Sequence, residues 1–580
     1  MLTRQIIALA ALAGLALLTP ARAEAPLQLR KATVGAATSW FAPDVSPEEV
    51  RWPAPPTDGM KNAPIFGYAH RWKPGQPIPN AERVQMPLYR NFDSDDPKWW
   101  DQQLDELLFT RPPLIFLIAR GCTKPEDRNS FVGPGNMCPY KLRMMVDAVR
   151  RNAAEDAVRF ALFVDTGATF ALRRTLTREP GEPLERYVEG KIDPSTLFSL
   201  SDERDISGRT ALWYFWNAAI KPWFDTIPRD FWFYIEHNGK KKPVITFWDI
   251  AHRFKDREHN TTSLLMQIKD KFESEYGLEP FFIVGSSWIT GDPGLARRHD
   301  LIGGVHSWFN TRFGEPVSNE AAISRWTGQR WETTGRPNGL SSLTEWNNQS
   351  WGVTIPGFSC GAGCRIAPVD RASGRNFDTV LQQNKSSFLN LIEGFNGPLE
   401  DTAVYRSRAT SPDDVTRYLK LLRRYNDPLT QITRLQAESA DWISAPRSNL
   451  AKQPFDHNFA VKQLNDAEEG AWALETASVG DGFGYKDLFI EGAFYRFVLR
   501  ASTASSNATV RVQVDGVTVA EATVPASPDG KPTVTALGYA HVETGTHDVK
   551  VLTSGDVSID WITVKRENLD GQGPKRDRPQ

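Results

Sequence analysis

Short apolar runs recur along the first two thirds of the chain, and polar residues follow most of them. Eight runs can be recognised: PIFGYAH, LIFLIAR, FALFVDT, VITFWD, FFIVGSS, LIGGVHS, GVTIPGF and FLNLIEGFN, which begin at residues 64, 114, 160, 244, 281, 301, 352 and 388. Most are apolar at nearly every position, which is typical of strands buried on both faces of a parallel sheet. The pattern therefore predicts eight buried parallel strands.

Helix-like stretches lie between several of these runs. They read DPKWWDQQLDELLF, YKLRMMVDAVRRNA and NTTSLLMQIKDKFESEY, and Pro97 in the first suits an opening helical turn. A helix between the sixth and seventh runs is hard to see. Eight strands with interleaved helices nevertheless indicate an α/β fold, a (β/α)8 TIM-type barrel over residues 64–428 that the helical stretch SPDDVTRYLKLLRRYND closes.

The pattern changes beyond residue 430 to short segments with alternating apolar and polar positions. Among them are AFYRFVLRAS, ATVRVQVDGVTVAEATV, GTHDVKVLTS and VSIDWITVKR, and VDG between two alternating runs is typical of a hairpin. We expect an all-β, jelly-roll-like sandwich over residues 432–566. The polar tail 567–580 is expected to be disordered.

The first residues have the character of a targeting segment. A basic start, MLTRQ, precedes the apolar run IIALAALAGLALL and the small-residue sequence TPARA, so residues 1–23 are expected to be a signal peptide cleaved after Ala23. Residues 24–63 then form an N-terminal extension. No second apolar run approaches the length of a membrane span. The mature protein is therefore expected to be secreted or periplasmic, and monomeric.

Charge and composition narrow the class of partner. The 580 residues contain 68 Lys and Arg against 70 Asp and Glu, a formal net charge of -2, which argues against nucleic acid because phosphate binding needs a basic excess. The 19 Trp residues hint at carbohydrate, since indole rings stack on sugar faces. A large aromatic core would explain them equally well.

The four cysteines fall into two local pairs. An oxidising compartment favours the disulfides Cys122–Cys138 and Cys360–Cys364. Metal ligation is the alternative, but no His flanks either pair at zinc-ligand spacing.

Polar and aromatic residues stand at or just beyond the ends of many apolar runs. In a (β/α)8 barrel this end of the strands carries the active site. A single polar residue there is usually satisfied by a neighbouring loop, whereas several at one rim favour a site. The expected substrate-binding residues are Tyr68, His70, Asp165, Trp248, Trp288, His306, Trp308 and Asn396.

The C-terminal region resembles carbohydrate-binding modules of the family 6 and 35 type. The matching segments are LQAESAD, GAFYRFVLRAS followed by VRVQVDG, and IDWITV. The resemblance implies a structural calcium site to which Glu438 and Asp560 contribute, since calcium prefers hard oxygen ligands. No cofactor is expected for catalysis. A sandwich that only supports the barrel is the alternative.

The barrel more distantly resembles glycoside hydrolases of the endo-α-mannosidase and α-1,3-glucanase type, and a family of bacterial glycosidases carried as a domain of unknown function. NFDSDDPKWWDQQLDEL looks like that group's YDS-x-DP segment, and GFNGPLEDTAVYRS looks like its final-strand motif, WNEWxEGxxIxP. In this motif Asn396 takes the Asn position and Glu400 the second Glu. Gly397 replaces the first Glu, so one catalytic role is unfilled at its usual place.

Glycosidic cleavage requires a general acid and a second carboxylate. The resemblance makes Glu400 the expected acid, and its partner is sought among Glu393, Asp249 and, ranked lower, Asp165. A secreted glycoside hydrolase is the favoured function. A catalytically inactive polysaccharide-binding protein and a structural envelope protein are the alternatives.

Overall fold

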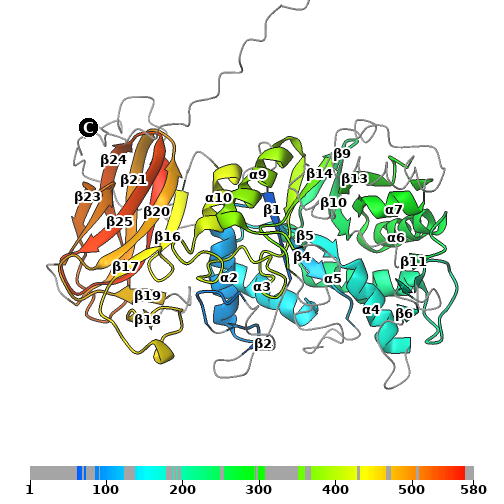
Figure 1. Cartoon of the computed structure of the whole chain (residues 1–580), viewed down its shortest axis with the longest axis horizontal. Helices are drawn as coiled ribbons and strands as arrows, with labels where there is room; N and C mark the ends of the chain where they lie inside the picture. Colours follow the sequence, from blue (N-terminus) through cyan, green and yellow to red (C-terminus); the bar gives the residue numbers. More distant parts are fainter. Residues whose placement is uncertain are drawn as a thin grey trace, which may run out of the picture.

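A computed structural model gives the fold over most of the chain after residue 61. It describes residues 62–67, 71–72, 85–90, 92–122, 137–177, 187–188, 191–192, 198–248, 254–292, 294–295, 298–306, 350–359, 368–427, 432–464, 472–504 and 508–567. Within them, a closed barrel lies beside a sandwich of antiparallel strands (Figure 1).

Eight parallel strands form the barrel within the described residues. They are β1 (Asn62–Phe66), β4 (Ile115–Ala119), β5 (Phe160–Val164), β10 (Lys240–Phe247), β12 (Phe281–Gly285), β13 (Ile302–His306), β14 (Ser350–Thr354) and β15 (Leu389–Ile392). They pair in the order β12-β13-β14-β15-β1-β4-β5-β10, and pairing of β10 with β12 closes the ring. Every one of the eight predicted runs is therefore confirmed as a barrel strand.

Helices cover the outside of the barrel (Figure 1). They are α2 (Pro97–Phe109), α3 (Pro139–Arg151), α4 (Thr166–Thr177), η3 (Trp213–Ile220), α5 (Lys221–Thr226), α6 (Asn260–Tyr276), α7 (Ser286–Gly291), α9 (Arg375–Gln383) and α10 (Arg417–Asn426). The three predicted helices and the closing helix are confirmed. In α2, the Asp96 side chain caps the first turn by accepting from the Lys98 N–H, with Pro97 at the first helical position.

Short strands and 3-10 helices lie in the segments between the barrel strands and helices. The strands are β2 (Arg71–Trp72), β3 (Phe92–Asp93), β6 (Tyr187–Val188), β7 (Lys191–Ile192), β8 (Phe198–Ser199), β9 (Tyr234–His237) and β11 (Phe254–Lys255). The 3-10 helices are η4 (Arg229–Phe231), η9 (Ala372–Gly374) and η10 (Asn384–Ser386). Strand β9 extends the sheet antiparallel to β10.

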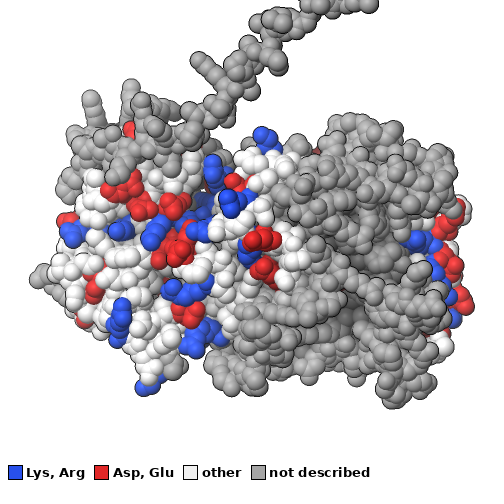
Figure 2. Space-filling model, in the orientation of Figure 1, with Lys and Arg blue, Asp and Glu red and all other residues white. Residues whose placement is uncertain are grey.

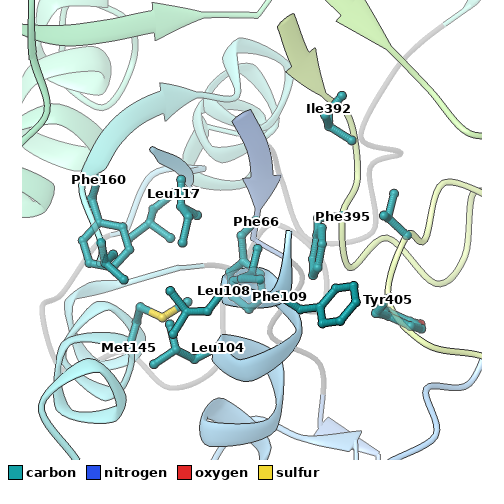
Figure 3. Close-up of a cluster of buried hydrophobic side chains, with 14 of the residues drawn as sticks. Phe66, Leu104, Leu108, Phe109, Leu117, Met145, Phe160, Ile392, Phe395 and Tyr405 are labelled. Atoms are coloured by element: carbon teal, nitrogen blue, oxygen red, sulfur yellow. The ribbon is translucent and has the colours of Figure 1, made fainter. Parts of the chain in front are cut away.

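Alternate residues of each barrel strand supply two separate cores. Ile65, Phe116, Ile118, Phe163 and Leu391 belong to a cluster that fills the barrel interior. Their neighbours in the sequence face outward and pack against the helices. Figure 3 shows this outer core between the strands and helices α2 and α3, with Phe66, Leu117, Phe160 and Ile392 from the strands. The period of two therefore tells which strand residues face the barrel axis.

The π-helix η3 holds the loop that follows β4. Its Ala218 carbonyl lies four residues before Pro222, whose nitrogen has no hydrogen, so the α-helical donor for this carbonyl is missing. The Cys122 N–H donates to it instead, at 2.8 Å. Gly121 precedes with φ of +90°, and a Cβ there would lie 2.7 Å from a Leu172 methyl group. The loop at the end of β4 is thus fastened to η3.

The C-terminal strands form two facing antiparallel sheets. The strands are β16 (Ile432–Gln436), β17 (Trp442–Ser444), β18 (Val461–Gln463), β19 (Trp472–Glu475), β20 (Gly482–Ile490), β21 (Ala493–Ser502), β22 (Thr509–Val514), β23 (Val517–Thr523), β24 (Thr533–Val542), β25 (Gly545–Thr553) and β26 (Ser558–Glu567), with η11 (Leu450–Lys452) between β17 and β18. One sheet has the order β18-β19-β26-β21-β24 with β16 beside β26, and the other β17-β20-β25-β22-β23. The predicted sandwich fold is confirmed.

Polar contacts join the barrel to the sandwich. The Gln436 amide donates to Asp105 at 2.8 Å, and the Asp456 N–H donates to the Leu88 carbonyl at 2.7 Å. The Lys420 ammonium binds Asp441 at 3.0 Å. The two parts therefore share buried polar groups as well as apolar surface.

Glu106 of α2 is a fully buried acid of this junction. Its carboxylate accepts the Arg406 N–H at 2.8 Å, and both side chains are 0% exposed. The Arg406 guanidinium lies 5.1 Å from the centre of the Phe109 ring. Burial raises the pKa of Glu106 to about 7, although the Arg406 charge opposes the rise.

Candidate functional site

The C-terminal ends of the barrel strands bring five polar or aromatic side chains to one mouth. Three of them lie two positions beyond a residue of the inner cluster, the fourth packs against that cluster, and the fifth pairs in register with its Trp351, so all five face the barrel axis. They are His306 on β13, Glu393 after β15, Arg120 after β4, Asp165 after β5 and Trp248 after β10. Hydrogen bonding between neighbouring strands continues past the strand ends. Backbone N–H groups donate to the carbonyl of a neighbouring strand in three pairs: Asp165 to Ala119, Trp248 to Val164, and Glu393 to Thr354.

Arg120 and Asp165 form an ion pair within this ring. The Arg120 Nε lies 3.0 Å from an Asp165 carboxylate oxygen, and the two side chains are 9% and 15% exposed. Asp165 was expected at the mouth and is found there. Arg120 was missed, although its place two residues after Ile118 was the signal that could have identified it.

Trp248 and His306 lie on the side of the ring near β10 and β13. Trp248 is half-buried against the inner cluster. His306 is fully buried, and its Nε2 lies 3.0 Å from the Phe247 carbonyl oxygen. Both therefore occupy the inner face, His306 deeper than Trp248.

Trp288 does not line the mouth, contrary to the expectation. It lies on α7, which begins directly after β12, and this turn of the chain directs its indole into the outer core. It is 0% exposed, packs against Phe247 at 5.2 Å between ring centres, and donates to the Trp248 carbonyl at 2.9 Å. Trp288 is a core residue.

Glu393 and Asn396 lie where β15 runs out. Glu393 is 7% exposed and, counted around the barrel, is three strands away from Asp165, with β1 and β4 between them. The two carboxylates thus project from nearly opposite sides of the mouth. Asn396 is fully buried, and its side-chain oxygen accepts from the Gly67 N–H at 3.1 Å. Asn396 therefore ties the ends of β1 and β15 together.

Glu400 stands on the loop after β15 and is half-buried. Its carbonyl accepts from the Ser359 N–H at 2.9 Å, which joins it to the loop that follows β14. Asp401 beside it is bound to Arg371 at 2.7 Å and has φ of 58°. The loop is thus fixed beside the mouth, on the strand-end side of the barrel.

Several expected site residues lie outside the described residues. They are Tyr68, His70, Asp249, Trp308, Cys360 and Cys364. The other predicted disulfide, Cys122–Cys138, is confirmed and joins the loop after β4 to the start of α3.

Glu438 and Asp560 are buried in the sandwich, 3% and 1% exposed. Burial, and then the charge of Asp560, raise the pKa of Glu438 well above its usual range. Arg500 binds the Asp560 carboxylate and supplies the counter-charge that a cation would bring. Within the described part of the chain no three His, Cys, Asp or Glu side chains form a metal-binding group. These side chains do not by themselves fit a calcium ion, and the calcium site stays a prediction.

The fold and the mouth define a TIM-type barrel with carboxylates at its strand ends, followed by a β-sandwich. Residues 61–442 match the model of the family described as Domain of unknown function (DUF5010). The chain belongs to this family. Residues 456–564 match the model described as Carbohydrate binding module (family 35). Comparison with curated proteins finds no match.

Solved structures similar to this chain include the GH99 endo-alpha-mannosidase from Bacteroides thetaiotaomicron, 13% identical over 63% of this chain and 97% of that chain, with a TM-score of 0.38. The C-terminal CBM6 of LamC from Zobellia galactanivorans is 18% identical over 23% and 100%, with a TM-score of 0.20. A family 6 module from Clostridium cellulolyticum, in complex with xylose, is 21% identical over 23% and 96%, with a TM-score of 0.18. The two family models confirm the expected resemblance to a domain of unknown function and to carbohydrate-binding modules of family 35.

No helix in the described ranges combines the length and the apolar character that crossing a bilayer requires.

Proposed function

We propose that the protein is a secreted or periplasmic glycoside hydrolase that cleaves a polysaccharide or oligosaccharide by carboxylate catalysis. The observation that carries the proposal is the barrel mouth, where Glu393 faces the axis and Glu400 lies on the loop that follows the same strand. Glycosidic cleavage needs two carboxyl groups on either side of the scissile bond. Trp248 in the same ring offers an indole for a sugar face.

Glu400 is assigned as the general acid and Glu393 as the second carboxylate. Glu393 lies four residues before Gly397, where the related motif has its first Glu, and its inward position suits the missing role. Asp165 forms an ion pair with Arg120 and is assigned to bind the substrate. Asp249, beyond Trp248, remains a further candidate for the second carboxylate.

Release of reducing ends from a panel of polysaccharides tests the activity. Glu400→Gln should lower turnover by about 10²-fold or more on natural linkages, because it removes the proton donor. An activated aryl glycoside needs little protonation and should be affected much less. Glu393→Gln should lower turnover on both substrates, and the exposed Glu155→Gln serves as the control.

A catalytically inactive polysaccharide-binding protein is the second candidate, and Gly397 is the observation that favours it. Such a protein would be retained on insoluble polysaccharide without releasing reducing ends. If Glu393→Gln and Glu400→Gln both release reducing ends as fast as the native chain, neither Glu393 nor Glu400 is a catalytic group.

A further inference from the structure

A groove of about 300 Å³ lies between helices α9 and α10 of the barrel and strand β20 of the sandwich. No residue that we assign to the barrel mouth lines it. Figure 2 shows basic and acidic side chains gathered on the face where the sandwich meets these helices. The volume is at the lower end of the range of about 300–1,000 Å³ for small-molecule sites.

Arginines supply the positive charge of this groove. Arg417 and Arg424 lie two turns apart on one face of α10, and Arg375 begins α9. The Arg417 Nε lies 3.8 Å from an Asp414 carboxylate oxygen, a contact longer than a hydrogen bond, so the Arg417 guanidinium keeps donors for a ligand. Among the described residues neither Arg375 nor Arg424 forms an ion pair, and both are exposed. Lys420 is neutralised by Asp414 at 2.7 Å. The arginines are therefore the groups that can bind a ligand anion.

The other side chains that line the groove are of the kinds that bind sugars. Phe489 is half-buried, and the Arg424 guanidinium lies 5.7 Å from its ring centre. Asp378 accepts from the Tyr425 hydroxyl at 2.6 Å and retains acceptor capacity, and Asp487 is exposed. An aromatic ring, carboxylate acceptors for hydroxyls, and guanidinium forks for an anion thus meet in one groove.

A strained turn forms one rim. Ala372, Ser373 and Gly374 have φ of 46°, 54° and 91°, and such conformations cost free energy at non-glycine residues. The turn is held because the Ala372 N–H donates to Asp370 at 2.8 Å. A Cβ on Gly374 would come within 3.4 Å of the Arg417 side chain, so the turn packs closely on α10. Strain of this kind concentrates at functional sites.

We propose that this groove binds an acidic sugar unit, with its carboxylate held by Arg417 and Arg424. A singly charged carboxylate suits the site better than phosphate, because Asp378 and Asp487 repel a multiply charged anion while accepting hydroxyl hydrogen bonds. The choice of a sugar rests on the proposed carbohydrate function. Binding in the groove does not require hydrolysis at the mouth, so the site would hold a polysaccharide beside the barrel.

Calorimetric titration of the full chain with a short oligogalacturonate tests the proposal. The double variant Arg417→Gln/Arg424→Gln should bind about tenfold or more weakly, since charge-assisted hydrogen bonds are lost. Binding by the native chain should weaken as salt is raised. Arg143→Gln/Arg150→Gln, which removes the same charge from exposed positions on α3, should leave the affinity unchanged.

Equal oligogalacturonate affinity in the native chain and the Arg417/Arg424 variant would overturn the proposal, as would no binding by the native chain. A neutral xylo-oligosaccharide or inorganic phosphate that binds as tightly as oligogalacturonate at this groove would overturn it too. Circular dichroism of each variant checks the fold. In Glu393→Gln the oligogalacturonate affinity should persist while reducing-end release is lost, which separates the groove from the proposed hydrolysis.

Discussion

Replacing Glu106 by Gln tests the account of the junction between barrel and sandwich. Glutamine has the shape of the protonated acid and can still accept the Arg406 N–H that Glu106 accepts at 2.8 Å. The groups that act on this carboxyl are Arg406, Asp105 and Gln102, and the buried Tyr405 lies close enough to feel its charge. The substitution therefore removes one titration and leaves the packing in place.

The magnitude follows from the pKa. Burial raises the pKa of Glu106 from 4.5 to about 7, so the folded chain holds this proton more tightly than the unfolded chain. The contribution of this bound proton to the free energy of unfolding is fully present below about pH 4.5 and is lost as the pH rises through about 7. One pKa unit corresponds to about 1.4 kcal/mol, so about 2 to 3 kcal/mol should disappear between pH 5 and pH 8.

Urea unfolding of the native chain and of Glu106→Gln at several values between pH 5 and pH 8 provides the measurement. The stability of the variant relative to the native chain should rise by that amount as the pH increases. Asp414 and His457, whose pKa values burial shifts up and down respectively, titrate in both proteins and cancel in the difference. Glu155→Gln, at an exposed position, should give a flat difference. A flat difference for Glu106→Gln as well would refute the reasoning.

Further substitutions and treatments probe the two cores and the loops. Gly304→Ala would place a Cβ 2.4 Å from the Trp351 indole inside the barrel, and calorimetry should show a loss of about 1–3 kcal/mol; no loss would mean that the ring can move aside. Arg500→Met would remove the buried guanidinium that binds Asp560 and should lower the free energy of unfolding by about 3–5 kcal/mol. Added calcium that restored the melting temperature would support the predicted calcium site, and an unchanged melting temperature without calcium would contradict the expected loss. Reduction of the disulfide after β4, whose cysteines are 16 residues apart, should lower stability by about 3 kcal/mol; an unchanged unfolding midpoint would contradict this.

The barrel strands could be predicted because burial on both faces leaves a simple record in the sequence. Each run of near-continuous apolar residues became a strand of the closed ring, since few other environments accept such segments. The π-helix over Trp213–Ile220 left no comparable record. Its residues are almost all apolar, so no period distinguishes a helix from a strand.

The site was predictable where strand parity decides the direction of a side chain. Asp165 and Glu393 follow inward residues by two positions, and both reach the mouth. The prediction for Trp288 was wrong because the chain turns into a helix immediately after β12. The number of residues between Trp288 and the strand therefore no longer determines where its side chain points. The ion pair of Arg120 depends on the neighbouring strand, which sequence spacing alone does not reveal.

Pro222 has a consequence for the evolution of this barrel. Because Pro222 has no N–H, the Ala218 carbonyl accepts from the Cys122 N–H, and this hydrogen bond anchors the rim of the barrel beside Arg120. Pro222→Ala would give the helix its own N–H donor for this carbonyl, and a screen for thermal stability would select it. The same change would let the helix compete for that carbonyl and loosen the rim. Selection for a tougher scaffold and selection for a well-shaped mouth therefore pull this single position in opposite directions.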